Sequence, residues 1–210
     1  MENFAIHIGV DESGKGDFFG PLVIAGVLVN EKNAKLFANL GIKDSKKITD
    51  KKILELEKHI KANAVHSIVA ISNSRYNELY GNIKNLNKLL AWGHARVIEN
   101  IAEKHDCEYA LSDKFGDESL IKSALMKNGR NIRLEQMVRA ESDVAVAAAS
   151  VLARATFVQK MKSLADTYGI VFPKGCAPQV KTAAQEFIAK YGKNRLNEVC
   201  KTHFKTYNEV

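Results

Sequence analysis

Cysteine and proline are scarce in this chain, and long apolar runs are absent. The 210 residues include three prolines and three cysteines, Cys107, Cys176 and Cys200. An odd number of widely spaced cysteines excludes the disulfide framework of a small secreted domain and suits a reducing compartment. The N-terminus lacks the features of a signal peptide, and no segment approaches the ~18 uninterrupted apolar residues of a membrane span. We therefore expect a soluble, cytoplasmic protein without membrane contact.

A linker rich in proline, glycine or serine is also missing, and so are internal repeats. With 46% hydrophobic and 26% charged residues, the chain can bury a substantial core, so we expect one domain spanning residues 1–210. The 31 Lys and Arg against 24 Asp and Glu give a net charge of +7. This surplus favours a polyanionic partner, nucleic acid first, although a solvated lysine-rich surface would give the same count.

The hydrophobic pattern predicts an α/β protein. Short β-rich runs predict strands at 4–10, 21–29, 65–72, 107–113 and 131–138. Helical spacing predicts helices at 47–62, with Thr49 or Asp50 as N-cap, and at 85–104 and 143–169. Three strands followed by strands that alternate with helices indicate a mixed sheet covered by helices.

Four acidic residues fall at or beside the predicted ends of these elements: Asp11, Glu12, Asp113 and Asp143. Several carboxylates meeting at one place would repel each other unless a divalent cation such as Mg²⁺ or Mn²⁺ sat among them. Asp11 and Glu12 can share a site only if their strand ends there, because neighbouring strand residues point to opposite faces. The alternative for Asp143 is a helix cap, and most acidic residues are simply solvated.

The motifs around these acids resemble a known family. The segment GVDESGKGDFFGPLVIAGVLV is similar to the opening signature of type 2 ribonucleases H, the group that holds ribonucleases HII and HIII. GIKDSKKITDKK, LSDKF and ESDVAVAAASVLARATF resemble three further family segments in the family's order. GKG, FPKG and VCKTHFKT are closer to ribonuclease HIII than to HII. The resemblance implies a ribonuclease H-like α/β fold with a mixed five-stranded sheet.

The resemblance also implies an activity. Asp11, Glu12, Asp113 and Asp143 would be the catalytic residues and would hold two divalent ions, Mg²⁺ or Mn²⁺, at the scissile phosphate. The expected enzyme is a monomeric endonuclease that cuts the RNA strand of RNA–DNA hybrids, leaving 5′-phosphate and 3′-hydroxyl ends. It would remove primers and R-loops during DNA replication and repair.

Substrate binding is expected at two basic segments. The residues implied by the resemblance are Ser13, Gly14, Lys15, Gly16, Lys46 and Lys47. Missing side chains at the glycines would let the nucleic-acid backbone approach, and exposed amides there could contact a phosphate or a ribose 2′-hydroxyl. A plain turn and a solvated lysine-rich face are the alternative readings.

Two departures from the family pattern leave rival interpretations open. The catalytic motif begins at Asp11, without the N-terminal substrate-binding domain typical of ribonuclease HIII. Cys176 stands where HII-like sequences have a tyrosine that recognises the RNA-to-DNA junction, which favours cutting at runs of ribonucleotides. The rivals are an HII-like enzyme for single embedded ribonucleotides, a non-catalytic hybrid-binding module, and a nuclease of the same fold that cuts DNA.

Three further features receive no site role. Cys200 and His203 have a CxxH spacing, but no second pair stands at a distance suitable for zinc. Trp92 and the pair Phe18 and Phe19 are expected in the core, as isolated aromatics usually are.

Overall fold

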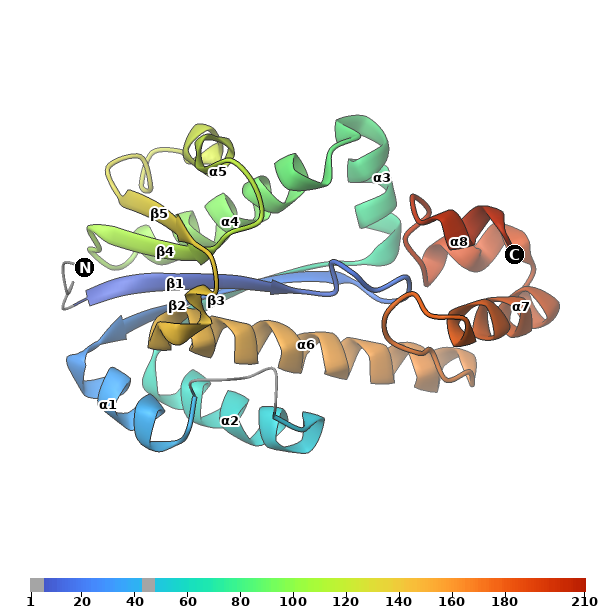
Figure 1. Ribbon diagram of the computed structural model, residues 1–210, viewed down its shortest axis with the longest axis horizontal. Helices are drawn as coiled ribbons and strands as arrows, with labels where there is room; N and C mark the ends of the chain where they lie inside the picture. Colours follow the sequence, from blue (N-terminus) through green and yellow to red (C-terminus); the bar gives the residue numbers. More distant parts are fainter. Residues whose placement is uncertain (1–5, 43–47) are drawn as a thin grey trace.

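A central sheet lies between two layers of helices (Figure 1). The computed structural model describes residues 6–42 and 48–210. The strands are β1 (Ile6–Ser13), β2 (Leu22–Asn30), β3 (Val65–Ile71), β4 (Tyr109–Asp113) and β5 (Arg133–Met137). Their order is β3-β2-β1-β4-β5, with antiparallel pairing of β1 to β2 and of β2 to β3, and parallel pairing of β1 to β4 and of β4 to β5. The expected mixed five-stranded sheet is confirmed.

The helices are divided between the two faces of this sheet and its far end. They are α1 (Glu31–Asn39), α2 (Asp50–Asn63), α3 (Asn73–Ile83), α4 (Leu86–Ala102), α5 (Glu118–Ala124), α6 (Val144–Tyr168), α7 (Gln179–Tyr191) and α8 (Lys205–Asn208), with 3₁₀ turns η2 (Ala140–Ser142) and η3 (Lys193–Glu198). Figure 1 shows α1, α2 and α6 on one face, α4 and α5 on the other, and α7 and α8 beyond the sheet. The loop after β1 reaches toward this C-terminal group.

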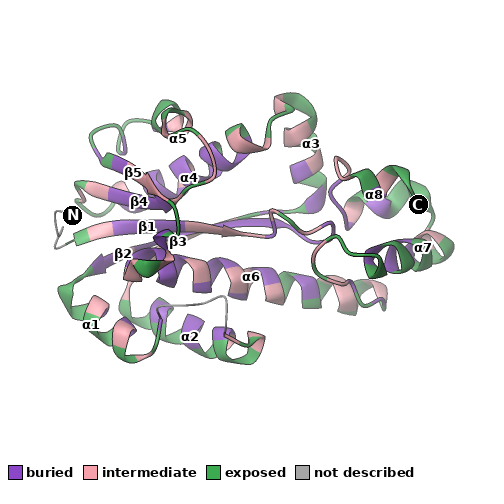
Figure 2. Ribbon diagram, in the orientation of Figure 1, coloured by how far each residue is buried: buried purple, intermediate pink, exposed green. Residues whose placement is uncertain are grey.

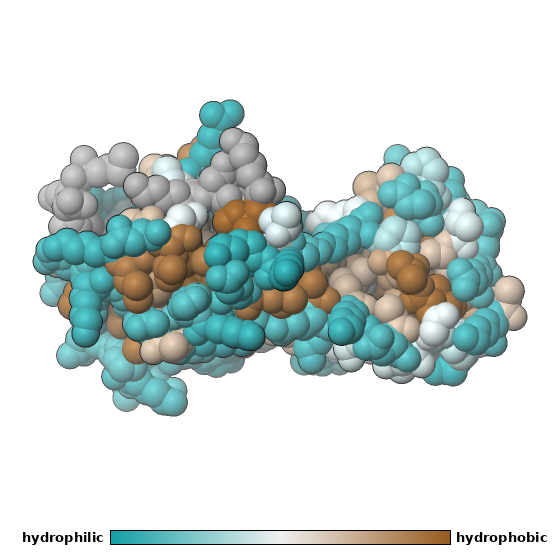
Figure 3. Space-filling model, turned by 90° about the horizontal axis from the view of Figure 1, so that it is seen from below, coloured by the Kyte–Doolittle hydropathy of each residue, from teal (hydrophilic) through white to brown (hydrophobic). Residues whose placement is uncertain are grey.

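Both faces of the sheet are covered by apolar side chains. One buried cluster joins the sheet to α6 and α2, and a second joins it to α4. Figure 2 shows the buried residues on both sides of the strands, with exposed residues on the outer sides of the helices. Seen from the side of α1 and α2, the surface has hydrophilic residues with hydrophobic patches between them (Figure 3). The strands are thus held in place by packing on both faces.

Helix α6 is the central helix and packs directly on β1. Within the described ranges it is the one helix long and apolar enough to cross a membrane, but 61% of its most apolar window is buried inside the protein, as in a core helix. A Cβ on Gly9 would lie 2.1 Å from the carbonyl carbon of Ala145 and 2.2 Å from the amide nitrogen of Val146. Glycine at position 9 therefore allows the backbone of α6 to lie directly against the backbone of β1.

Some sequence-based expectations differ from the structure. β1 does not end before the acidic pair but continues to Ser13, because β2 pairs with it along its whole length. Trp92, expected in the core, is 38% exposed, whereas Phe18 and Phe19 are buried. Thr49 caps α2 as expected. Lys46 and Lys47 lie outside the described residues.

The close packing of α6 gives a stability prediction. We expect Gly9→Ala to lower the free energy of unfolding by about 3 kcal/mol, because the new methyl group meets backbone atoms that cannot rotate away. The control is Gly81→Ala in α3, where a Cβ would have no atom within 4 Å. It should stabilise the protein by up to about 1 kcal/mol, since alanine loses less backbone entropy. Urea unfolding measures both, and equal effects of the two substitutions would contradict this account.

Candidate active site

The acidic pair on β1 points to two different helices. The Asp11 carboxylate receives a hydrogen bond from Ser150 of α6. The Glu12 carboxylate lies on the opposite face, where Oε2 is 3.1 Å from Nε2 of His94 in α4. The alternation follows from the strand geometry that continues through both residues. The two carboxylates therefore lie on opposite faces of the sheet.

Asp113 joins them at the end of β4. The parallel register pairs Val10 with Ser112, so the next residues along, Asp11 and Asp113, lie on neighbouring strands. Asp113 is held by the backbone amide of Ala140, which donates to Oδ1 at 3.1 Å. The structure thus places Asp113 beside Asp11, whereas Glu12 follows Asp11 in the chain and faces α4.

The surroundings of Asp11 disfavour the negative charge of its carboxylate. Burial, together with the negative charges of Glu12 and Asp113, raises the pKa of Asp11 to about 7. Hydrogen bonds from Ser150 and from the Glu12 amide oppose this rise without cancelling it. A carboxylate crowded in this way is stabilised by a cation that takes the place of the proton.

Glu12 is shifted in the opposite direction. Burial acts to raise its pKa, but the hydrogen bond and charge of His94, followed by the charge of Lys15, outweigh burial and lower it. The Lys15 ammonium lies 3.4 Å from Oε1 of Glu12. The site thus holds one carboxylate that is readily ionised beside one that is not.

Asp143 is joined to a different part of β1. It is the N-cap of α6, and its Oδ1 accepts from the amides of Ala145 at 2.9 Å and Val146 at 3.1 Å. Its other partner is His7, whose Nε2 is 3.0 Å from Oδ2. His7 precedes Asp11 by four residues, about 13 Å along a strand. The helix-cap alternative therefore accounts for the contacts of Asp143, and its role as a metal ligand stays a prediction.

Glu141 is an acidic residue for which the sequence predicts no metal-binding role. It follows Ala140 directly in η2, so it lies next to the amide that holds Asp113. The sequence carries a signal for it, because Glu141 stands in the same ESD segment as Asp143. Glu141 differs from Asp143 in lying directly after Ala140, whose amide contacts Asp113.

The glycine loop after β1 has two glycines with different roles. Gly14 has φ +88°, and a Cβ there would lie 2.2 Å from the carbonyl oxygen of Pro21, so its conformation serves the protein's own packing. Gly16 is exposed, and a Cβ there would have no atom within 4 Å. Between them, Lys15 turns back toward Glu12. Of these residues, Gly16 leaves the most room for a substrate backbone.

Lys201 fixes the far end of this loop. Its buried Nζ donates to the carbonyl oxygens of Asp17 at 2.8 Å and Gly20 at 2.7 Å. Burial lowers the pKa of Lys201 to about 8, and the charge of Asp17 opposes that shift. The loop is therefore held by a C-terminal residue.

The neighbouring CxxH pair shows no metal-site geometry. Cys200 is buried and forms a backbone bridge with Phe19. The ring of His203 stacks on Tyr80 at 4.3 Å between centroids. Both residues have packing roles, as expected.

The donor chemistry of the three acids fits a divalent cation in an open site. Among residues 6–42 and 48–210, no group of three or more His, Cys, Asp or Glu side chains stands close enough to hold a metal ion by itself. Their hard oxygens and the crowding that raises the pKa of Asp11 nevertheless suit Mg²⁺ or Mn²⁺. Mg²⁺ is commonly bound by one or two carboxylates together with waters and substrate phosphates. We therefore expect the substrate to complete the coordination.

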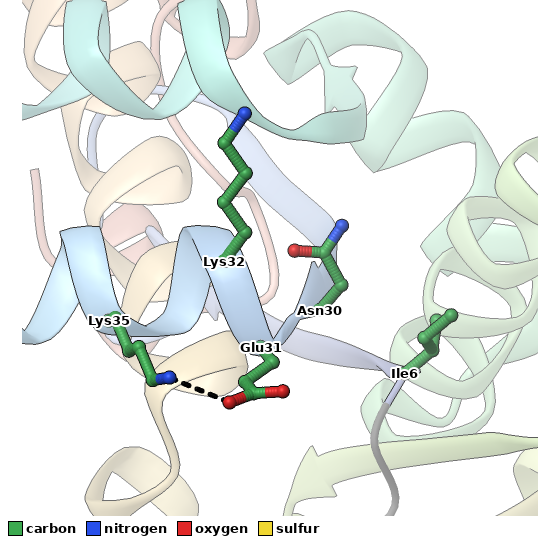
Figure 4. A pocket seen from close by; sticks show the side chains of 5 residues that line it. All are labelled: Ile6, Asn30, Glu31, Lys32 and Lys35. Carbon is green, nitrogen blue, oxygen red and sulfur yellow. Dashed lines mark hydrogen bonds and ion pairs between the residues drawn. The ribbon is translucent and has the colours of Figure 1, made fainter.

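A surface hollow at the start of α1 is separate from these acids. It is lined by Ile6, Asn30, Glu31, Lys32 and Lys35 (Figure 4). Ile6 begins β1, so the hollow lies toward the other end of that strand from the acidic pair. Its one carboxylate, Glu31, pairs with Lys35 at 2.6 Å. It offers no metal-binding chemistry.

Comparisons with known proteins show which family the chain resembles. A family model described as Ribonuclease HII matches residues 8–207. Ribonuclease HIII of Protochlamydia amoebophila is 45% identical over 97% of this chain and 68% of its own length. Ribonuclease HIII of Chlamydia felis is 46% identical over 97% of this chain and 69% of its own length. The crystal structure of Bst-RNase HIII in complex with Mn²⁺ has a TM-score of 0.90 at 31% identity, covering 97% of this chain and 68% of that one.

The raised pKa of Asp11 predicts how stability depends on pH without metal. The unfolded chain loses this proton near the ordinary pKa of 3.8 and the folded protein near 7. Folding stability therefore falls between these two pH values, and the full cost, about 4 kcal/mol, remains above pH 7. With a chelator present, we expect Asp11→Asn to raise the melting temperature more at pH 8 than at pH 5.

The matched control for this measurement is Asp166→Asn, because Asp166 is an exposed residue of α6. It should leave the melting temperature nearly unchanged at both pH values. A stabilisation by Asp11→Asn that is equal at pH 5 and pH 8 would contradict the electrostatic account.

Proposed function

Because the chain belongs to the ribonuclease HII family and is therefore a ribonuclease H, we propose that it hydrolyses the RNA strand of RNA–DNA hybrids in a reaction that needs divalent metal ions. The observation that carries the proposal is the position of Asp11 and Asp113 on neighbouring strands, with Glu12 next to Asp11 and the glycine loop directly after them. The relative solved with Mn²⁺ supports the choice of ion. The net charge of +7 favours a polyanionic substrate.

The chain's own residues would bind the ions and orient the scissile phosphate. Asp11, Glu12 and Asp113 would supply carboxylate oxygens, with Asp11 giving up its proton when an ion binds. When bound, two divalent ions would supply positive charge to the phosphate and promote ionisation of the attacking water, giving 5′-phosphate and 3′-hydroxyl ends. Gly16 would let the RNA backbone approach, and the amides of Ser13 to Gly16 would contact the ribose 2′-hydroxyl or a phosphate. Lys46 and Lys47 remain predicted phosphate contacts.

The experiment is cleavage of three duplexes under Mg²⁺ and Mn²⁺ titration, with products mapped to single nucleotides. We expect cutting within runs of ribonucleotides, slower cutting at a single embedded ribonucleotide because Cys176 cannot stack on a sugar, and no cutting of all-DNA duplex. Asp11→Asn should abolish hydrolysis and leave the fold intact by circular dichroism.

Each other outcome favours a named rival. Faster cutting at the single ribonucleotide would favour an HII-like enzyme, and cutting of the all-DNA duplex would indicate a different nuclease. Hybrid binding with no metal-dependent cleavage would favour a non-catalytic module. Near-normal turnover by Asp11→Asn would overturn the proposed metal site.

The fourth carboxylate of the site can be assigned by a matched pair of variants. We expect Asp143→Asn to lower the cleavage rate on the order of 10²-fold, because Asp143 is the fourth ligand that the family resemblance implies. Glu141→Gln should cost far less, because the contact of its segment with Asp113 comes from the backbone amide of Ala140 and not from the Glu141 side chain. Single-turnover rates at saturating Mg²⁺ measure both, and the reverse ranking would assign the role to Glu141.

A further inference from the structure

A buried histidine connects the two strands that carry the acids. His94 is 0% exposed, and both of its ring nitrogens have partners. Nε2 lies 3.1 Å from Oε2 of Glu12 on β1, and Nδ1 lies 3.0 Å from Oγ of Ser112 on β4. Ser112 is the residue directly before Asp113. One side chain of α4 therefore contacts a candidate ligand on β1 and the neighbour of a candidate ligand on β4.

The hydrogen positions follow from the partners. An ionised Glu12 carboxylate has no hydrogen to give, so Nε2 of His94 must donate. Ser112 either donates to Nδ1 of a neutral ring, or accepts from a charged ring while donating to the carbonyl oxygen of Asp113, which lies 3.0 Å away. In both arrangements Glu12 receives an N–H from His94.

Close packing of α4 on the sheet fixes where this N–H points. A Cβ on Gly93 would lie 2.7 Å from Cδ1 of Ile24 on β2, so the helix sits directly on the strands at the residue before His94. The ring of Phe115 covers the histidine, with 4.7 Å between the ring centroids. The imidazole is therefore held in one orientation by packing as well as by its two hydrogen bonds.

The position of Glu12 explains why such a partner is required. Its side chain points toward the apolar cluster formed by the sheet and α4, and a buried carboxylate without a donor is strongly destabilised. Lys15 contacts the other oxygen at 3.4 Å, but its side chain is 39% exposed, so it is a weaker restraint. His94 is the partner that fixes the carboxylate.

We propose that His94 is a positioning residue that holds the Glu12 carboxylate, through its Nε2–H, in the orientation that binds a divalent cation. The proposal rests on the proposed function of the acidic site. Groups that hold metal ligands in this way typically change metal affinity by about 10- to 100-fold when they are removed.

The test compares two substitutions of His94 whose side-chain amides extend to different distances from the backbone. The amide of His94→Gln extends about as far as Nε2, so it can still donate to Glu12. The amide of His94→Asn extends only about as far as Nδ1, so it keeps the hydrogen bond with Ser112 and loses the one with Glu12. Binding of Mn²⁺ without substrate, followed by electron paramagnetic resonance of the free ion, gives a dissociation constant that does not depend on activity. His59→Asn, at an exposed position of α2, is the control.

We expect His94→Asn to weaken Mn²⁺ binding by about 10-fold or more and His94→Gln to recover most of the loss. Raising the Mn²⁺ concentration should restore hybrid cleavage by His94→Asn. Circular dichroism should show that both variants are folded, and His94→Asn should melt at the lower temperature, because it leaves the buried Glu12 carboxylate without its donor. Equal Mn²⁺ affinities in folded His94→Asn and His94→Gln would overturn the proposal. Failure of the unsubstituted protein to cleave hybrids would instead overturn the proposed function, whatever the variants bind.

Discussion

The direct contact between α6 and the backbone of β1 is the constraint on which the site depends. Gly9 removes the side chain that would hold the helix away, and α6 then runs along the strand and the loop that follows it. Ser150 reaches Asp11, and further along the helix Phe157 lies under Gly14. Because the helix is straight and long, its placement at residue 9 also determines what supports the glycine loop. A shift of α6 would therefore disturb the acid and the loop together.

Strand alternation divides the acidic pair into two electrostatic environments. Asp11 faces α6, where burial and neighbouring carboxylates raise its pKa. Glu12 faces α4, where His94 and Lys15 lower its pKa despite burial. The pair is thus prepared unequally, with one carboxylate held ionised by the protein and one that needs an external positive charge. This inequality arises because β1 continues past the pair instead of ending there.

Periodicity and turn residues were sufficient to predict the mixed sheet and the helices α2, α4 and α6. The helices bury apolar residues at helical spacing, and the strands are short apolar runs because the sheet is covered on both faces. The site was less accessible to prediction. Aspartate at a helix start serves equally as cap or ligand, so the sequence could not separate Asp143 from Glu141. The sequence predicts no role for His94, because a histidine within an apolar helix can be assigned one only from the strand residues that it contacts. Contacts between distant segments identify the partners of His94, whereas the choice between Asp143 and Glu141 rests on the two variants.

The glycine loop shows how far apart such determinants can lie. Its last residues are held by Lys201, more than 180 positions later in the chain, through hydrogen bonds to two carbonyl oxygens. A second C-terminal contact comes from Gly175, whose amide donates to Asp17 at 2.6 Å. Removing either donor would leave a polar group of the loop without its partner, which buried groups tolerate poorly. The segments that connect the C-terminal helices thus complete the loop that follows the acidic pair, although those helices lie beyond the sheet (Figure 1). The glycine loop therefore has its full set of hydrogen bonds only when these C-terminal segments have packed onto it.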